Sequence, residues 1–169
     1  VWGVLAGGIF AAPWIAQEIF RPMVEVAKET PILQRGYAPN RLEMWDMVAK
    51  RALERPILGH GIEATKAIKD FPPAEHNISN EFLHPHNFAL QLWIELGILG
   101  PLFAAIFFGA ILRAASRMEA ISARTALAIL FASVTIVTTG YGLWQGMWVA
   151  VFGSMFSLHA LSASRKTPQ

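Results

Sequence analysis

Long apolar stretches alternate with one long polar stretch and one short basic stretch along this chain. A helix rises about 1.5 Å per residue, so about 20 apolar residues cross the ~30 Å hydrocarbon core of a bilayer. Residues 1–20 and 88–112 are each long enough for one crossing. The stretch 125–161 would form a helix of roughly 55 Å, and its glycine-rich break at 140–146 divides it into two crossings. The pattern predicts an all-α, polytopic membrane protein with about four transmembrane helices.

The basic residues indicate how these helices are oriented. Arginines gather in the predicted loop 113–124, and Arg165 and Lys166 lie in the predicted tail 162–169. Because positively charged flanks tend to stay in the cytoplasm, both segments are expected on the cytoplasmic side. Residues 21–87 then form one large periplasmic loop, since a loop of this length is translocated largely regardless of its own charge.

This loop carries a second kind of pattern. Between residues 41 and 55 the apolar positions recur on one face, which predicts an amphipathic helix. Asn40 is a suitable N-cap, and Glu43 three residues later completes a capping box. Pro56 ends the helix, and the turn at 59–61 redirects the chain.

Composition narrows the class of protein. Of the 169 residues, 54% are hydrophobic and 15% are charged, which favours a bilayer as the surrounding partner. The net charge of +2 is too small to indicate a surface that binds nucleic acid. The absence of cysteine excludes disulfides and thiolate chemistry. Val1 lies inside an apolar run without a basic segment before it, so we expect the carboxy-terminal part of a larger membrane protein and not a signal peptide.

The candidate chemistry gathers where the large loop meets the helix expected over 88–112. Two histidines, His84 and His86, immediately precede Asn87, and Gln91 and Glu95 follow within the apolar run. The last three polar residues are spaced i, i+4 and i+8, which places them on one stripe of a helix. Polar groups at such a position are costly and usually mark a pathway or a site.

Three motifs occur in order along the chain: Asn40-Arg41-x-x-x-Trp45, then Pro56-x-x-Gly59-x-Gly61, then His86-Asn87 followed after nine residues by Gly97-x-x-Gly100. Together they resemble the pattern of the O-antigen ligase and polymerase superfamily of bacterial membrane glycosyltransferases. Pro101 and Leu102 stand where that family often carries small hydroxylated residues. This departure bears on the choice between ligase and polymerase.

The resemblance implies transfer of a glycan from undecaprenyl diphosphate to an acceptor hydroxyl, at the periplasmic face of the bacterial inner membrane. The acceptor is a lipid A–core sugar in a ligase and another lipid-linked glycan in a polymerase. His86 is then the general base, because an imidazole can accept the proton of a sugar hydroxyl. Arg41 is the diphosphate clamp, because a guanidinium stabilises the leaving group's charge without a metal or other cofactor.

The other candidates are expected to contact the substrate around these two: Arg35, His84, Asn87, Gln91 and Glu95. Gln91 and Glu95 either touch the acceptor sugar or hydrogen-bond to neighbouring helices. The glycines at 97 and 100 are expected to serve close helix packing. Arg51 and Arg55 are expected to be solvated surface charges.

The same residues allow three other interpretations. His84 and His86 could bind a metal with His60, His76 or Glu81, but no third ligand has a recognisable spacing, so no metal is expected. A transporter or flippase would use the polar stripe as a path, yet its ionisable groups gather at one mouth and not at the midplane. A purely structural membrane subunit leaves the histidines without a role.

Overall fold

The computed structural model describes residues 1–35, 37–71 and 84–140, together with five single positions: Trp144, Ala150, Gly153, Ser154 and Ser157. Over these residues the secondary structure is entirely helical, which confirms the predicted all-α class. The helices are α1 (Trp2–Ile15), the π-helix η1 (Ala16–Phe20), α2 (Met23–Glu29), α3 (Pro31–Arg35), α4 (Ala38–Glu54), α5 (Ala64–Ala67), α6 (Phe88–Leu96), α7 (Leu99–Ala115) and α8 (Ala120–Thr139). Most of the last predicted crossing and all of the tail 162–169 lie outside the described residues.

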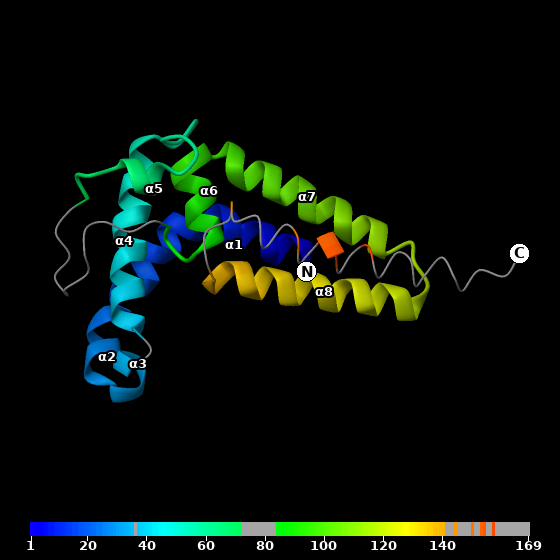
Figure 1. The fold of residues 1–169 in the computed structure, drawn as a ribbon, viewed down its shortest axis with the longest axis horizontal. Coiled ribbons are helices and arrows are strands. Elements are labelled where there is room, and N and C mark those ends of the chain that lie inside the picture. Colours follow the sequence, from blue (N-terminus) through cyan, green and yellow to red (C-terminus); the bar gives the residue numbers. More distant parts are fainter. Residues whose placement is uncertain are drawn as a thin grey trace, which may run out of the picture.

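Figure 1 shows an elongated bundle, formed by α1, α7 and α8, that meets a lobe at one end. The lobe, here called the α4 lobe, consists of α2, α3, α4 and α5. Helix α4 crosses the end of the bundle and packs on α1, η1 and α6, while α2 and α3 pack beside it. Helix α6 therefore lies at the junction of the bundle and the lobe.

Apolar helices make up the bundle. Within the described residues, the 19-residue helix Trp2–Phe20 is long and apolar enough to cross a membrane, and Leu99–Ala115 and Ala120–Ile136 are shorter apolar helices. On α7, Phe103 and Phe107 are each 61% exposed. Apolar side chains exposed in this way suit a surface that faces lipid or other membrane helices. The number of crossings stays a prediction.

The stretch expected to form one helix over 88–112 is divided in two. Helix α6 ends at Leu96 and α7 begins at Leu99, because Gly97 turns the chain with φ 59° and ψ −145°. A Cβ on Gly97 would lie 2.5 Å from the carbonyl carbon and oxygen of Ile57. The prediction of one continuous helix is therefore wrong. The physical reason is the backbone of the loop after α4, which passes directly against this glycine.

Helix α4 begins earlier than the predicted range of 41–55. Its N-cap is Tyr37, which has φ 56°, and Pro39 lies in its first turn. Proline suits a helix start, because its φ is already helical and its missing N–H needs no partner there. The prediction that Asn40 is the N-cap is therefore wrong, since Asn40 lies inside the first turn.

The core lies where α1, α4 and α6 meet. Leu90 and Ile94 of α6 are fully buried in one cluster with Val48 of α4. Burying a side chain of this size contributes about 1.5–3 kcal/mol. Ala49 and Ala52 of α4 are also fully buried. These small residues let α4 and α6 approach closely, so the two helices that carry the motifs form one packed unit.

Indole hydrogen bonds fix α1 against the later helices. Trp93 Nε1 donates to the carbonyl oxygen of Ile9, and Trp2 Nε1 donates to that of Ala105, each at 3.0 Å. The ring of Trp14 meets the ring of Trp93 edge-on, with centroids 5.6 Å apart. Helix α1 is thus tied to both α6 and α7.

Candidate active site

His86 stands immediately before the N-cap of α6, in an unusual backbone conformation. Its φ is 49°, the left-handed region that residues other than glycine seldom adopt. Its Nδ1 lies 2.7 Å from the carbonyl oxygen of Gly140, at the end of α8. A carbonyl oxygen only accepts, so Nδ1 donates the hydrogen bond. In the neutral imidazole Nε2 then carries the lone pair, which is the form a general base requires.

His84 lies beside His86. The two ring centroids are 4.3 Å apart, with the planes inclined by 41°. Partial burial lowers the pKa of His84 below its ordinary value of 6.5, and the charges of His86 and Lys66 lower it further. The shift favours a neutral His84 next to the proposed base.

Asn87 organises the start of α6. It is the N-cap, and its side-chain oxygen accepts hydrogen bonds from the backbone N–H groups of Ala89 at 3.1 Å and Leu90 at 3.2 Å. An N-cap of this kind contributes about 0.5–2 kcal/mol. The predicted substrate contact of Asn87 is not tested by this arrangement, but its carboxamide oxygen already serves the helix.

Trp45 connects the first motif to the histidines. Its Nε1 donates to the carbonyl oxygen of Pro85 at 2.8 Å, between the two histidines in the chain. The ring of Trp45 also meets the ring of Phe20, with centroids 5.2 Å apart and the planes inclined by 49°. Arg41 lies one turn earlier on α4 and therefore starts on the same helix face as Trp45. This face brings a half-buried arginine to the side of α4 that holds the histidines.

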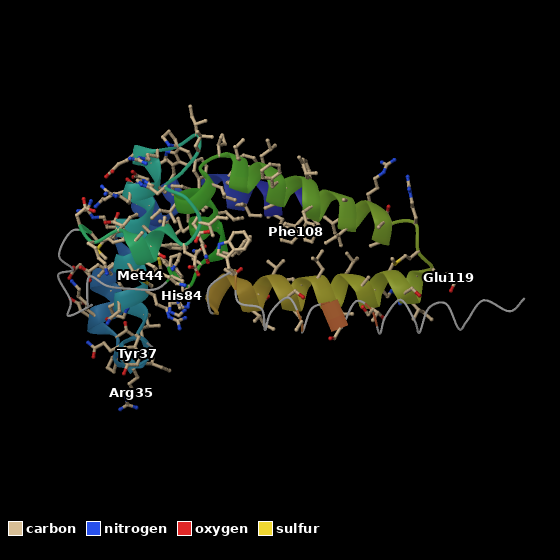
Figure 2. The ribbon with its side chains drawn as sticks, turned by 45° about the horizontal axis from the view of Figure 1, so that its top comes forward. Arg35, Tyr37, Met44, His84, Phe108 and Glu119 are labelled. Atoms are coloured by element: carbon tan, nitrogen blue, oxygen red, sulfur yellow. The ribbon has the colours of Figure 1, made fainter. Side chains whose placement is uncertain are left out.

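Arg35 lies elsewhere. It is the last residue of α3 and is exposed. Figure 2 shows it at the far end of the α4 lobe, away from the labelled His84. Any contact of Arg35 with the substrate would therefore be at the far end of the lobe and not beside the two histidines.

Gln91 and Glu95 lie in the interior. They are 4% and 1% exposed, and Gln91 Nε2 donates to Glu95 Oε1 at 2.9 Å. Trp144 Nε1 donates to the other carboxylate oxygen, Oε2. The backbone N–H of Glu63 is a third donor to this carboxylate. Both residues are therefore buried in the interior. The sequence predicts for them either a contact with the acceptor sugar or hydrogen bonds to neighbouring helices.

The second and third motifs meet through their backbones at the other end of α6. Three hydrogen bonds join them: His60 N to Ile94 O at 2.8 Å, Gly61 N to Glu95 O at 2.9 Å, and Ile98 N to Pro56 O at 2.7 Å. A Cβ on Gly59 would lie 2.5 Å from the carbonyl carbon and oxygen of Glu95. Gly59 and Gly97 therefore serve this close approach of two backbones, whereas Gly100 packs against Leu92 of α6.

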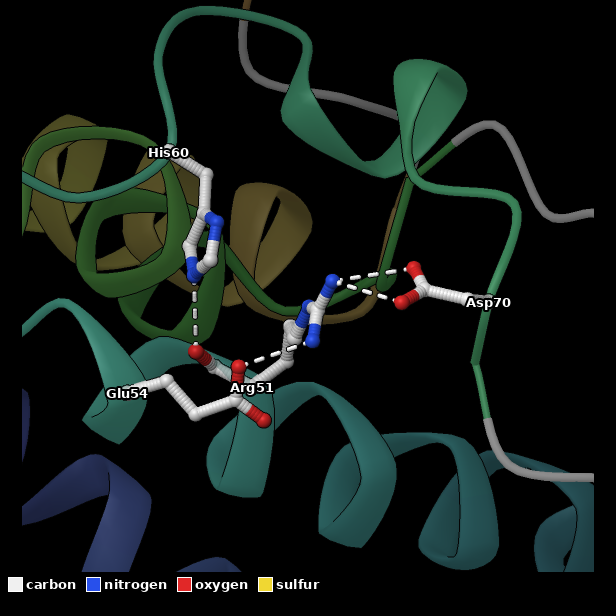
Figure 3. A network of polar contacts seen from close by, with 4 residues as sticks. All are labelled: Arg51, Glu54, His60 and Asp70. Atoms are coloured by element: carbon white, nitrogen blue, oxygen red, sulfur yellow. Dashed lines mark hydrogen bonds and ion pairs between the residues drawn. The ribbon is translucent and has the colours of Figure 1, made fainter.

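A polar network holds the same loop on α4, as Figure 3 shows. Arg51 Nη2 lies 2.9 and 3.1 Å from the two carboxylate oxygens of Asp70, and Nη1 lies 2.8 Å from Glu54 Oε2. His60 Nε2 donates to the backbone oxygen of Arg51 at 2.8 Å. The expectation that Arg51 is simply a solvated surface charge is therefore wrong, since its half-buried side chain pairs with Asp70 and joins the loop to α4. The i, i+3 spacing of Arg51 and Glu54 is typical of a helix ion pair, but the sequence carries no signal of the contacts with Asp70 and His60.

Two cavities flank this region. An apolar groove of about 320 Å³ lies between α1, α6 and α8, with Asn87 and Phe88 in its lining. A polar cavity of about 620 Å³ lies between η1, α2 and α4 and includes Asp46 and Lys50. The polar cavity and the apolar groove share no lining residues. The sequence predicts neither of these two cavities.

Metal binding was a possible use of the histidines. Within the described residues, no group of three or more histidine, cysteine, aspartate and glutamate side chains could hold a metal ion. His76 and Glu81 lie outside the described residues. Metal independence stays a prediction.

Comparison with known proteins identifies the family. Residues 2–105, more than half of the chain, match the family described as O-Antigen ligase. The chain therefore belongs to the O-antigen ligase family, which confirms the resemblance that the three motifs indicate. No solved structure matches it significantly.

Curated relatives agree with this family. A Rickettsia conorii protein named "Putative polysaccharide ligase" is 32% identical over 119 residues, covering 67% of this chain and 29% of that protein. A Rickettsia prowazekii protein of the same description is 34% identical over 119 residues, covering 66% and 29%. The chain thus spans less than a third of the length of these relatives. The family is one of O-antigen and polysaccharide ligases by description, and the apolar helices together with the family indicate a membrane protein.

Proposed function

We propose that this chain carries the catalytic base of a glycan transferase, which moves a glycan from undecaprenyl diphosphate to an acceptor sugar hydroxyl. The observation that carries the proposal is the hydrogen bond from His86 Nδ1 to the Gly140 carbonyl, since it leaves Nε2 as the proton acceptor. The full-length enzyme is expected to act at the periplasmic face of the inner membrane, with residues 21–87 on that side.

The transfer step is a displacement at the anomeric carbon of the donor sugar. The acceptor hydroxyl oxygen forms a bond to this carbon, and the bond from the carbon to the diphosphate oxygen breaks. The diphosphate leaves with the bonding electron pair, and His86 Nε2 takes the hydroxyl proton. General-base catalysis of this kind contributes about 10²–10⁴-fold in rate.

Arg41 is proposed to bind the diphosphate. The leaving group gains negative charge as the bond breaks, and a guanidinium can contact two phosphate oxygens at once. The support is its position one turn before Trp45, whose indole holds Pro85 between the two histidines. Arg41 can thereby act from α4 on a donor that lies beside His86, and no metal ion is needed for charge stabilisation.

The apolar groove beside Asn87 supports a lipid-linked donor. Its lining comes from α1, α6 and α8, and it lies at the end of α6 where His86 stands. A polyprenyl chain in such a groove would place its diphosphate near the polar end of the bundle. Asn87 and His84 then lie, together with His86, near the donor's sugar-diphosphate linkage.

The test is a transfer assay with the full-length enzyme in membranes or detergent. The expected result is glycan transfer from an undecaprenyl diphosphate donor that continues after removal of divalent cations by EDTA. Transfer that is lost on chelation and restored by Mg²⁺ or Zn²⁺ would contradict the metal-independent mechanism. One glycan per lipid A–core acceptor identifies a ligase, which we favour, whereas a ladder of lipid-linked repeats identifies a polymerase.

A further inference from the structure

We propose that Glu95 is a positioning residue for His86, because it anchors Trp144 and thereby the nearby Gly140 carbonyl that binds His86 Nδ1. The inference rests on the proposed function, in which His86 is the base. It gives the buried carboxylate a role that differs from substrate binding.

The first observation is the depth of the carboxylate and the origin of its partners. Glu95 is 1% exposed, and its side chain accepts hydrogen bonds from Gln91, from Trp144 and from the backbone of Glu63. These donors come from three segments: α6 itself, the turn before α5 and the chain beyond α8. A buried carboxylate is costly unless such donors surround it. An apolar residue would fill the same space without that cost, so the carboxylate serves to hold the donors.

The second observation concerns the segment that Trp144 belongs to. Gly140 ends α8, and Trp144 follows it by four residues in the sequence. His86 binds the first of these two residues and Glu95 binds the second. From Asn87 to Glu95 the helix is about 12 Å long. Two contacts, one near each end of α6, therefore join Gly140 and Trp144, which are four positions apart in the chain, to one helix.

The consequence is chemical. If Gly140 shifts by about 1 Å once Trp144 is released, its carbonyl loses the short contact with Nδ1, because hydrogen bonds weaken steeply outside their usual distance and angle. His86 is then no longer confined to the form in which Nε2 has the lone pair. The base becomes less effective, whereas the affinity for the donor, which Glu95 does not touch, stays the same.

The test uses Glu95→Gln and Trp144→Phe in the full-length enzyme. Glu95→Gln keeps the size of the side chain but turns an NH₂ group toward N–H donors, and Trp144→Phe removes one donor from a partly exposed residue. Each variant is expected to lower kcat about 10-fold, with KM for the donor unchanged. Here kcat is counted per donor-binding site, and a 10-fold change corresponds to about 1.4 kcal/mol. Because both remove the same contact, the double variant should be no slower than the slower single variant.

The matched control is Trp2→Phe, which removes an indole hydrogen bond of the same kind between α1 and α7. It should leave kcat unchanged. In ¹⁵N NMR of the histidines, the Nδ1-protonated form of His86 should lose population in Trp144→Phe but not in Trp2→Phe. This readout is one that a loss of packing alone would not change.

Several outcomes would overturn the inference. Normal kcat in Trp144→Phe would rule out the positioning role, and so would multiplied effects in the double variant. A raised KM at constant kcat would also rule it out, because Glu95 would then be a substrate contact. If Glu95→Gln does not fold, Trp144→Phe decides alone. Failure of the proposed function is recognised separately, because His86→Ala would then keep its activity.

Discussion

The two ends of α6 are held in different ways. At its start, side chains make the contacts: Asn87 caps the helix, Trp45 binds Pro85, and His86 binds the end of α8. At its end, backbone packs on backbone, because Gly59 and Gly97 bring the loop after α4 within 2.5 Å of where a Cβ would lie.

The third motif therefore contains two kinds of residue: those that position functional groups and those that hold the helix in place. At the glycine end the backbones of α6 and of the loop after α4 meet directly, so the glycines there hold α6 in place. The histidine end positions functional groups by single hydrogen bonds that can be altered without removing the core. Substitutions at the two ends should therefore fail differently, the first in folding and the second in rate.

Gly97→Ala should have the largest effect on the folded protein. Its backbone conformation is strained for any other residue, which costs about 1–3 kcal/mol, and the new Cβ would collide with Ile57. We expect a strong loss of folded protein, measured as membrane level and as Tm in detergent. Gly61→Ala is the control, since Gly61 has φ 98° but open space around it. Equal Tm values for Gly97→Ala and the natural protein would show that this end is not locked by its backbone.

Arg41→Ala should come next, with a loss of about 10–100-fold in kcat/KM, because a hydrogen bond to a charged group contributes about 1.5–3 kcal/mol. Donor affinity and rate should both fall, since the diphosphate is charged before and after bond cleavage. Arg41→Lys should restore only part of the loss, because an ammonium lacks the two-pronged contact. Arg55→Ala, at the exposed C-cap of α4, is the control. Similar losses in both variants would mean a general charge effect.

Trp45→Phe should have a smaller effect. The ring keeps its place beside Phe20, but the hydrogen bond to Pro85 is lost. A bond of this kind contributes about 0.5–1.5 kcal/mol, so we expect a decrease of roughly 3–10-fold in kcat. Trp93→Phe loses the indole bond to Ile9 and should lower Tm with kcat per folded enzyme unchanged. A Trp45→Phe variant with full kcat would show that the first motif does not support the candidate site through this hydrogen bond.

The smallest effect concerns pH. Folding lowers the pKa of His84 below 6.5, so the unfolded chain binds more protons than the folded chain between the two values. Stability is therefore full above pH 6.5 and decreases as the pH falls through the folded pKa. Tm should drop on acidification, and His84→Asn should drop less. A His84→Asn variant with the same pH dependence would assign the effect to another group.

Much of this arrangement could be predicted from the sequence. The apolar runs predict the helices, and three motifs in order predict the family. The division of 88–112 could not be predicted, because it depends on Ile57 meeting Gly97, a contact between segments 40 residues apart.

The burial of Glu95 was equally hidden. Its spacing from Asn87 and Gln91 predicts a shared stripe but not the direction in which that stripe points. The partners of His86 and Glu95, namely Gly140 and Trp144, lie about 50 residues further along the chain, in a stretch whose pattern indicates only membrane helices and a break between them. Tertiary contacts of this kind leave no local signal.

The central claim is that His86 is the base, and transfer by His86→Ala tests it most directly, with His84→Ala as its matched control. At equal membrane levels, His86→Ala should bind the donor normally yet transfer about 10²–10⁴-fold more slowly, because the base acts only in the transition state. His84→Ala should be milder. Normal transfer by His86→Ala would contradict the account, and a dead His84→Ala beside an active His86→Ala would move the base to the other histidine.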